Sequence, residues 1–145
     1  MWQTQHSEEF DVPPAAIWRL YADPDSWPRW DAGIKRLTID GPFAEGATGV
    51  LVPAGGPKVR YRLAEVVPER RFTDESRLPG MLLRGVHELE PLGPHGTRLT
   101  VTVTISGAMT WLFKGVIGGG IEKDGPETMR SLARMAATEG SSRVA

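Results

Sequence analysis

Apolar and polar residues alternate along six short segments in the middle of the chain. The alternation is cleanest from Arg98 to Ser106, where Leu, Val, Val and Ile positions are interleaved with Thr and Ser. Alternation with a period of two is typical of strands with one buried face and one wet face, and turn signals about every ten residues indicate an antiparallel meander. The predicted strands are Ile34–Asp40, Thr48–Val52, Lys58–Val67, Arg71–Arg77, Met81–Glu90 and Arg98–Ser106.

The pattern changes to a helical period near the C-terminus. From Ala108 to Ala137, apolar residues recur at intervals of three and four, which predicts one buried helical face. Gly118-Gly119-Gly120 and Asp124-Gly125-Pro126 interrupt this stripe, and glycine and proline both disfavour a helix interior. We therefore expect one long, bent helix over roughly 108–138, with Gly120 on its buried side, where a ligand or strand can approach closely. The tail after it is expected to fray.

The N-terminal part predicts one more strand and two short helices. Thr4 to Phe10 reads as a strand, and Pro13-Pro14 suit the first turn of a helix that ends before Asp23-Pro24. A short helical turn follows over 25–31. The fold class is therefore α+β, with a curved sheet that wraps its apolar face around the long helix.

Three segments of the chain resemble the START/Bet v 1-like (SRPBCC) superfamily, and within it the polyketide cyclase/dehydrase and lipid-transport group. They are FDVPPAAIW from Phe10, YADPDSWPRW from Tyr21 and GTRLT from Gly96. The resemblance implies a helix-grip fold, in which a seven-stranded antiparallel sheet grips the C-terminal helix around an apolar cavity. It also implies a small hydrophobic or amphipathic ligand, but no particular reaction.

Bulk composition narrows the range of partners. At 145 residues the chain fits one domain, residues 1–145, and its net charge of -1 with scattered basic residues argues against nucleic acid. No apolar run reaches the roughly 20 residues of a membrane span, so no stable membrane association is expected. The absence of cysteine and of a signal peptide favours a cytoplasmic protein without a thiolate metal site. A monomer or a homodimer is expected, with Trp111, off the apolar stripe, as a candidate contact.

Two titratable residues are candidates for general-base chemistry. His87 shares a strand face with Met81, Leu83, Gly85 and Leu89, so it should point toward the cavity. Its alternative is a core histidine bonded to backbone or water. Asp74 faces inward if Phe72 does, and the alternative is a carboxylate at the rim of the sheet in water. No histidine has the spacing of a metal ligand, and we expect no metal and no cofactor.

Binding of a small hydrophobic molecule, lipid-like or polyketide-like, is the function that these patterns favour. One alternative is a cofactor-free polyketide cyclase- or dehydratase-like enzyme that uses His87 or Asp74 as its base. Another is a protein-interaction module with a filled core. Trp27 is expected in the core, whereas the residues expected to bind the ligand are Trp30, Tyr61, Phe72, Leu83, His87, Val103, Phe113, Val116, Ile117 and Gly120.

Overall fold

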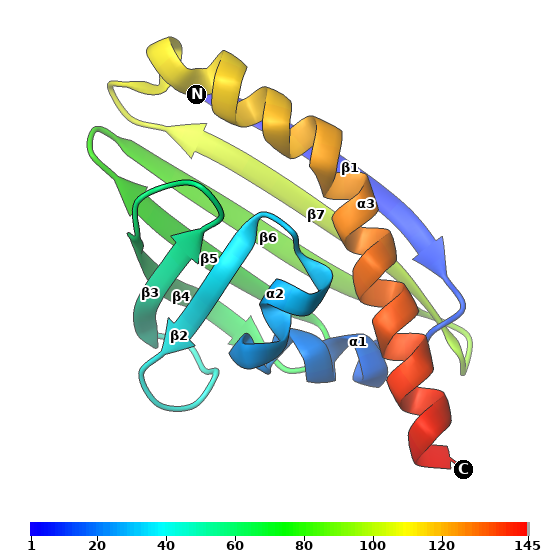
Figure 1. Cartoon of the computed structure of the whole chain (residues 1–145). Coiled ribbons are helices and arrows are strands. Elements are labelled where there is room, and N and C mark those ends of the chain that lie inside the picture. The colour runs from blue at the N-terminus through cyan, green and yellow to red at the C-terminus, as the bar shows by residue number, and fades with distance from the viewer. Residues whose placement is uncertain (145) are drawn as a thin grey trace.

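Among the described residues, seven strands form a sheet that wraps around one long helix, and two short α-helices follow the first strand (Figure 1). The structure is a computed structural model that describes residues 1–144, without the side chains of residues 112–114, 116 and 140–144. The elements in chain order are β1 (Trp2–Phe10), α1 (Pro14–Tyr21), the 3-10 turn η1 (Pro24–Ser26), α2 (Trp27–Trp30), β2 (Ile34–Ile39), β3 (Thr48–Pro53), β4 (Val59–Val67), β5 (Arg71–Leu78), β6 (Met81–Leu92), β7 (Gly96–Ser106) and α3 (Thr110–Val144).

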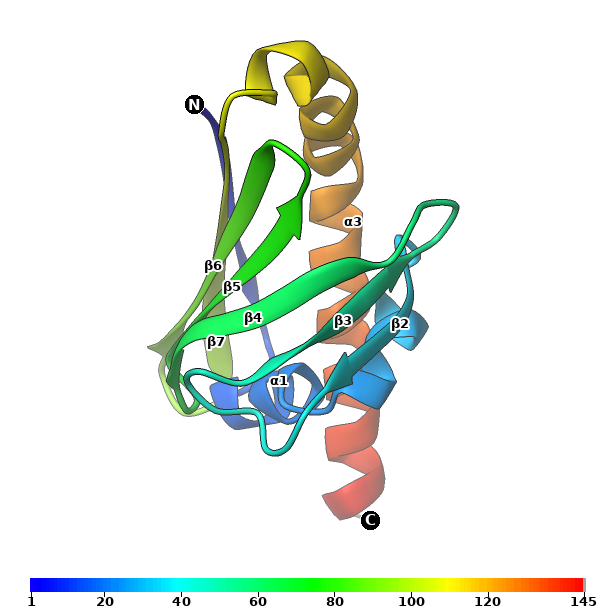
Figure 2. The ribbon, with the colours of Figure 1, turned by 90° about the vertical axis from the view of Figure 1, so that its left-hand side faces the viewer.

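All neighbouring strands pair antiparallel, in the order β1-β7-β6-β5-β4-β3-β2. The N-terminal strand therefore lies beside the last one, with Trp2 opposite Ile105 and Phe10 opposite Thr97. Register shifts in β2 and β4 mark bulges, which bend strands and increase their twist. Figure 2 shows the resulting curl, with α3 running along the hollow side of the sheet. The α+β helix-grip prediction is confirmed.

The hydrophobic core lies where α1, α2 and the C-terminal half of α3 meet the sheet. Each fully buried aliphatic or aromatic side chain stabilises the fold by about 1.5–3 kcal/mol. The core contains Ile17 and Leu20 from α1, Trp27 and Trp30 from α2, Leu63, Phe72, Leu89 and Leu99 from the sheet, and Met129, Leu132 and Ala136 from α3. Among the described residues, only the second half of α3 contributes to this cluster. The first half of the helix therefore lies outside the hydrophobic core.

Helix α3 runs without interruption from Thr110 to Val144 and contains Pro126 in its interior. Its axis changes direction near the middle, in the part coloured orange in Figure 1. A proline inside a helix removes one backbone hydrogen bond and its ring clashes with the preceding turn, which produces such a bend. The predicted long, bent element is present. Its predicted end near residue 138 was wrong, because the helix continues through the tail that was expected to fray.

One glycine of α3 allows a strand to approach the helix. Gly118 is buried, and a Cβ atom on it would lie 2.7 Å from Cζ2 of Trp2 on β1. Gly119 and Gly120 have open space at the same position. The close strand contact therefore falls at Gly118, whereas Gly120, which was expected on the buried side, is exposed and borders the space described next.

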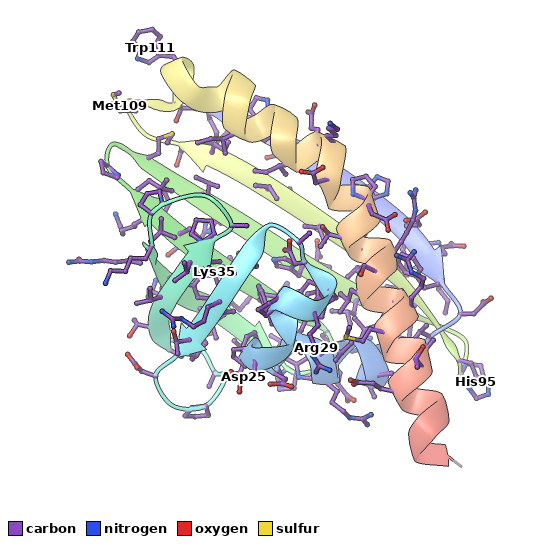
Figure 3. All side chains as sticks on the ribbon, viewed as in Figure 1. Asp25, Arg29, Lys35, His95, Met109 and Trp111 are labelled. Atoms are coloured by element: carbon purple, nitrogen blue, oxygen red, sulfur yellow. The ribbon has the colours of Figure 1, made fainter. Side chains whose placement is uncertain are left out.

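Outside this framework, Trp111 at the start of α3 is 71% exposed and His95 stands in the exposed β6–β7 turn (Figure 3). No helix in the described part of the chain has both the length and the apolar character needed to cross a membrane.

Candidate functional site

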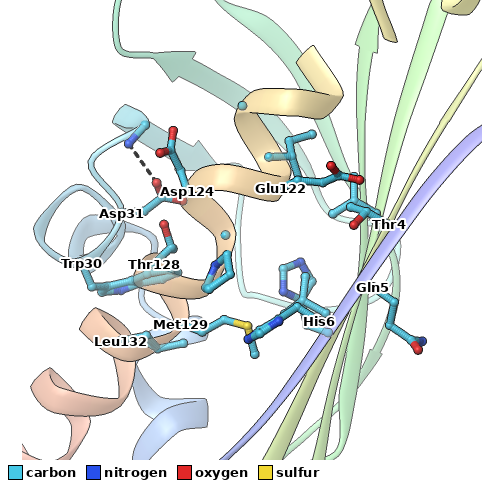
Figure 4. Close-up of a pocket in the computed structure, with 18 of the residues that line it drawn as sticks. Thr4, Gln5, His6, Trp30, Asp31, Glu122, Asp124, Thr128, Met129 and Leu132 are labelled. Carbon is cyan, nitrogen blue, oxygen red and sulfur yellow. Dashed lines mark hydrogen bonds between the residues drawn. The ribbon is translucent and has the colours of Figure 1, made fainter. Parts of the chain in front are cut away.

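A cavity of about 540 Å³ lies between the sheet, the α2–β2 junction and α3 (Figure 4). Its wall on the sheet side comes from β1, β6 and β7, and its opposite wall comes from the bent middle of α3. Most of the wall is apolar or aromatic, and the polar groups are grouped along parts of it. The lining residues are Thr4, Gln5, His6, Tyr21, Trp27, Trp30, Asp31, Gly33, His87, Val101, Val103, Ile117, Gly120, Ile121, Glu122, Asp124, Gly125, Pro126, Thr128, Met129 and Leu132.

Strand register places a polar triad beside this cavity. Asp74 on β5 stands directly opposite Gly85 on β6, and Phe72 stands opposite His87. Diagonal neighbours on one sheet face lie within reach of each other's side chains, so Asp74 reaches across to His87. Nε2 of His87 is 3.5 Å from Oδ2 of Asp74. The same oxygen accepts a 2.5 Å hydrogen bond from the hydroxyl of Tyr61, on β4.

Gly85 makes room for this arrangement. A Cβ atom on Gly85 would lie 2.6 Å from Oδ1 of Asp74 and 3.0 Å from Nε2 of His87. The first distance is too short for a real contact and the second is tighter than most, so a larger residue would displace Asp74 and crowd His87. The missing side chain on β6 thus allows a carboxylate and an imidazole to lie together in a largely enclosed place, where each side chain is only 15% exposed.

The His87 ring is held flat by its neighbours. It stacks on Phe72 with 4.1 Å between ring centroids and 5° between planes, and Tyr21 meets it edge-on at 5.3 Å. Nδ1 of His87 is buried and has no hydrogen-bond partner among the described residues. One nitrogen therefore faces Asp74, and the other keeps an unused capacity to donate or accept a proton.

The negative charge of Asp74 raises the pKa of two buried tyrosines, but only one of them donates a hydrogen bond to it. Burial, the negative charge of Asp74 and the hydrogen bond to it raise the pKa of Tyr61. Burial and the charges of Asp74 and Asp31 raise the pKa of Tyr21. Both phenols therefore stay neutral at physiological pH. Tyr21 is only 2% exposed and lines the cavity, yet its hydroxyl makes no hydrogen bond to any described residue.

The tryptophans of α2 present ring surface, not hydrogen-bond donors. The indole N–H of Trp27 donates to the carbonyl oxygen of Tyr21 at 3.0 Å, and that of Trp30 donates to Oγ of Ser26 at 3.1 Å. Ser26 in turn donates to the carbonyl oxygens of Leu20 and Asp23. These bonds fix both indoles against the cavity while satisfying their polar atoms.

Carboxylates border the other side of the cavity. Asp31 follows α2, and its Oδ1 accepts a hydrogen bond from the backbone N–H of Gly33 at 2.9 Å. Burial raises the pKa of the Asp31 carboxyl, the bond from Gly33 and the proximity of His87 lower it, and the charge of Asp124 raises it. Figure 4 shows Asp31 and Asp124 side by side. Glu122, which precedes Asp124 in α3, lies beside Thr4.

A second histidine, His6 on β1, also lines the cavity. Its Nε2 is 3.7 Å from Oε2 of Glu8, and Oε1 of Glu8 accepts a 3.1 Å bond from Arg130 of α3. The ion pair of Glu8 with Arg130 ties β1 to the C-terminal half of α3 and so supports the cavity wall.

The structure brings together only part of the set of ligand-binding residues expected from the sequence. Trp30, His87, Val103, Ile117 and Gly120 line the cavity, whereas the side chains of Phe113 and Val116 lie outside the described residues.

Three of the residues expected to contact the ligand do not line this cavity. Tyr61 and Phe72 are buried in the core, 2% and 0% exposed, because Tyr61 is occupied by Asp74 and Phe72 is covered by aromatic rings and His87. Leu83 lies on β6 closer to the β5–β6 turn and is not among the described cavity residues. Asp74 does not line the cavity either; it stands behind His87 and not in water at the rim.

Several lining residues were missed by the sequence reasoning. Trp27 was expected in the core, and Tyr21 was named only within a segment that carries the family resemblance, but both residues are buried and border the cavity. Asp31, Glu122 and Asp124 carry no motif. The break in the helical stripe around Asp124-Gly125-Pro126 coincides with the cavity wall and was a signal for Glu122 and Asp124, but it gave none for Asp31.

Chemically, the site offers an apolar pocket with two histidines, one unused phenol and a carboxylate border. No group of three or more His, Asp or Glu residues in the described part of the chain is arranged to hold a metal ion. Proton transfer and hydrogen bonding are the chemistry that these side chains can supply themselves.

Comparison with solved structures places this architecture among helix-grip proteins. Protein NE0264 from Nitrosomonas europaea is similar with a TM-score of 0.75 at 20% identity, over 96% of each chain. Protein TTHA0849 from Thermus thermophilus has a TM-score of 0.74 at 18% identity, over 95% of this chain and 99% of its own. Norcoclaurine synthase from Thalictrum flavum, in complex with dopamine and hydroxybenzaldehyde, has a TM-score of 0.71 at 13% identity, over 94% and 87%.

These identities are low, so the likeness concerns the fold. Ara h 8.0201, which covers 94% of this chain with a TM-score of 0.72, shares the same Bet v 1-like architecture. No curated protein matches the sequence significantly. The model of one sequence family, described as polyketide cyclase / dehydrase and lipid transport, matches residues 1–137. The chain therefore belongs to the polyketide cyclase/dehydrase and lipid-transport family.

Proposed function

We propose that this protein binds a small hydrophobic or amphipathic molecule, lipid-like or polyketide-like, in the cavity between the sheet and α3. The observation that carries the proposal is the cavity itself. Its volume of about 540 Å³ falls within the roughly 300–1,000 Å³ typical of small-molecule sites. A module that only docks other proteins would have no need to keep this space unfilled.

The wall chemistry supports an amphipathic ligand. Trp27, Trp30, Val101, Met129 and Leu132 offer apolar surface to the body of the molecule. His87, Tyr21 and Asp31 offer polar atoms at defined places, which would orient its functional group. The family model and the helix-grip relatives agree with a ligand-binding role of this kind.

Gly120 allows a sharp test of the site. A Cβ atom on Gly120 would meet open space, and the residue lines the cavity, so Gly120→Phe directs a large ring into the pocket without a backbone clash. Gly119→Phe is the matched control, because Gly119 also has open space but does not line the cavity. Both substitutions make the same change in helix propensity at adjacent positions.

The probe is 2-(1-naphthyl)ethanol, a neutral bicyclic alcohol, with affinity measured by isothermal titration calorimetry. We expect the wild type and Gly119→Phe to bind equally, and Gly120→Phe to bind at least about tenfold more weakly, because the added ring occupies the ligand's volume. Equal binding by both variants would place the probe elsewhere and contradict the proposal. Native mass spectrometry of the freshly purified protein would then identify any molecule that it retains.

A second function, general-base catalysis, is favoured by one specific observation. His87 faces Asp74 at 3.5 Å, Asp74 is held by Tyr61, and Gly85 leaves the space that the pair needs. A carboxylate that orients an imidazole is the usual arrangement of a catalytic base. In such a reaction His87 would take a proton from a carbon beside a carbonyl group, and the electron pair would move to the carbonyl oxygen.

Proton exchange tests this second function directly. The probe is 1-(1-naphthyl)propan-2-one in D₂O, followed by the loss of its α-proton signals in NMR. An enzyme would accelerate the exchange, and His87→Gln would reduce the acceleration about 100-fold or more, within the range of general-base contributions. Equal affinity of both proteins for the naphthyl alcohol controls for loss of the pocket. Binding of the ketone with exchange no faster than in buffer would leave a binding protein without this activity.

A further inference from the structure

We infer that the ligand is an amine, with an apolar body in the cavity and a protonated nitrogen held between the carboxylates of Asp31 and Asp124. The inference rests on the proposed function and adds the chemical class of the ligand. It follows from the charges of the wall, from one unsatisfied hydroxyl on a buried tyrosine and from the aromatic surface beside them.

The described wall of the cavity carries three carboxylates and two histidines, His6 and His87. Asp31, Glu122 and Asp124 line it, and no lysine or arginine is among its described residues. Glu122 and Asp124 make no ion pair or hydrogen bond to any described residue. Other carboxylates of α3 are paired: Glu127 lies 2.7 Å from Arg134, and Glu139 lies 3.7 Å from Arg29. The unpaired acids of α3 thus include the two that face the pocket.

The Tyr21 hydroxyl points independently to a polar ligand group. Tyr21 is 2% exposed, lines the cavity and has no hydrogen-bond partner among the described residues. Three neighbouring donors are satisfied, since Tyr61 donates to Asp74, Trp27 to the Tyr21 carbonyl oxygen and Trp30 to Ser26. Nδ1 of His87, beside Tyr21, also has no partner among the described residues. The Tyr21 oxygen therefore borders the cavity with its hydrogen-bonding capacity unused, and a polar group of a ligand would supply the partner.

Electrostatics determines the sign of the ligand's charge. Burial raises the pKa of the Asp31 carboxyl, the bond from Gly33 and the proximity of His87 lower it, and the negative charge of Asp124 raises it, so Asp31 lies in the repulsive field of Asp124. A cation between them relieves this repulsion, whereas an anionic ligand would increase it. The rings of Tyr21, Trp27 and Trp30 line the same cavity, and aromatic faces attract cations. An ammonium group satisfies the carboxylates, the phenol oxygen and the rings together.

Three probes with one ring system separate charge from shape. They are 2-(1-naphthyl)ethylamine, which is protonated at pH 7, the neutral 2-(1-naphthyl)ethanol and the anionic 1-naphthylacetate. Calorimetric titration at pH 7 is expected to show the amine binding about tenfold or more tightly than the alcohol, since hydrogen bonds to charged groups are the stronger ones, and the acetate binding most weakly.

Substitutions then locate the charge effect. Asp31→Asn and Asp124→Asn should each weaken amine binding about tenfold and reduce the preference for the amine over the alcohol by a similar factor. Asp25→Asn is the control, because Asp25 is an exposed carboxylate of η1 outside the cavity (Figure 3) and should change neither affinity. Asparagine keeps the shape and the acceptor oxygen of aspartate, so packing is preserved.

Equal affinity for amine and alcohol, or amine binding that survives both cavity substitutions, would overturn the inference about charge. The cavity would still be a binding site in that case, because the alcohol binds. If none of the three probes binds to the wild type, the proposed function itself fails.

Discussion

At the scale of single residues, Tyr21 and Tyr61 show how one hydrogen bond separates a structural phenol from one that is available to a ligand. Both are 2% exposed, and both feel the charge of Asp74. Tyr61 uses its hydroxyl to hold Asp74, whereas Tyr21 leaves its hydroxyl at the cavity without a described partner.

Replacing each tyrosine by phenylalanine should therefore give opposite results. Tyr61→Phe leaves the largely buried Asp74 carboxylate without its donor and should lower the free energy of unfolding by about 1–3 kcal/mol. Tyr21→Phe removes a hydroxyl that no described residue satisfies and should leave the stability unchanged or raise it. Urea unfolding followed by fluorescence measures both. A loss for Tyr21→Phe as large as that for Tyr61→Phe would show that the Tyr21 hydroxyl is structural.

The Asp31 carboxyl predicts a pH dependence of stability. Its pKa is raised in the folded protein, mainly by burial, so between the ordinary aspartate pKa of about 4 and the raised value the folded state binds more protons than the unfolded state. Its contribution to stability therefore falls as pH rises through that window. Asp31→Asn lacks the ionising group, so its advantage over the wild type should be near zero at about pH 3.5 and reach its full value at about pH 7.

Urea unfolding at several pH values across this window measures the difference, with Asp25→Asn as the control for the loss of an exposed carboxylate. Parallel stability curves for the wild type and Asp31→Asn would show that Asp31 ionises in the folded protein as it does in the unfolded chain.

Predictions for single residues were correct where the alternation along a strand determines the face to which a side chain points. The alternation along Met81–Glu90 indicated that His87 faces inward, and the structure has it at the cavity. The sequence alone did not identify which residue His87 meets, because the Asp74–His87 contact depends on the register that sets Gly85 opposite Asp74. Register between two strands is a tertiary property.

At the scale of elements, the glycines of α3 have different roles although they are adjacent in sequence. Gly118 faces Trp2, Gly120 faces the cavity and Gly119 faces open space outside the cavity. The helical stripe placed Gly120 toward the inside, but the strand contact at Gly118 depends on how β1 crosses the helix.

Alanine substitution should distinguish Gly118 from Gly119. Gly119→Ala adds a methyl group in open space and should raise the free energy of unfolding by about 1 kcal/mol through helix propensity. Gly118→Ala makes the same propensity gain, but its Cβ would lie 2.7 Å from Trp2, so it should be destabilising by about 1–3 kcal/mol. Thermal or urea unfolding compares them. A Trp2→Ala background should turn Gly118→Ala into a gain, and persistence of the loss there would rule out the Trp2 contact as its cause.

At the scale of the whole molecule, the cavity exists because α3 and the sheet touch at their ends and separate between them. The first part of α3 meets β1 at Gly118, and its last part packs in the core with α1 and α2. The bend near Pro126 lies between these contacts and contributes to the cavity wall.

A bound ligand should therefore stabilise the whole fold. At about 100 times its dissociation constant, 2-(1-naphthyl)ethylamine should add about 2.7 kcal/mol, which raises the Tm by roughly 5–10 °C for a chain of this size. Differential scanning fluorimetry should show this shift for the wild type and for Gly119→Phe at the same ligand concentration, and little shift for Gly120→Phe. A full shift for Gly120→Phe would mean that the stabilising site lies outside this cavity.

By itself, the sequence determined the element order, the fold class and the inward side of most strands, because these follow from local periodicity and from turn residues that act within a few positions. It also indicated the long helix and its bend, through Pro126. Only the tertiary structure decided which inward residues meet. The Asp74–His87 contact and the pair of carboxylates Asp31 and Asp124 at one border join residues from separate elements, and the hydroxyl of Tyr21 has no partner among the described residues. Their distances depend on strand register, on the missing side chain of Gly85 and on the path of α3, and none of these is a property of a local stretch of chain.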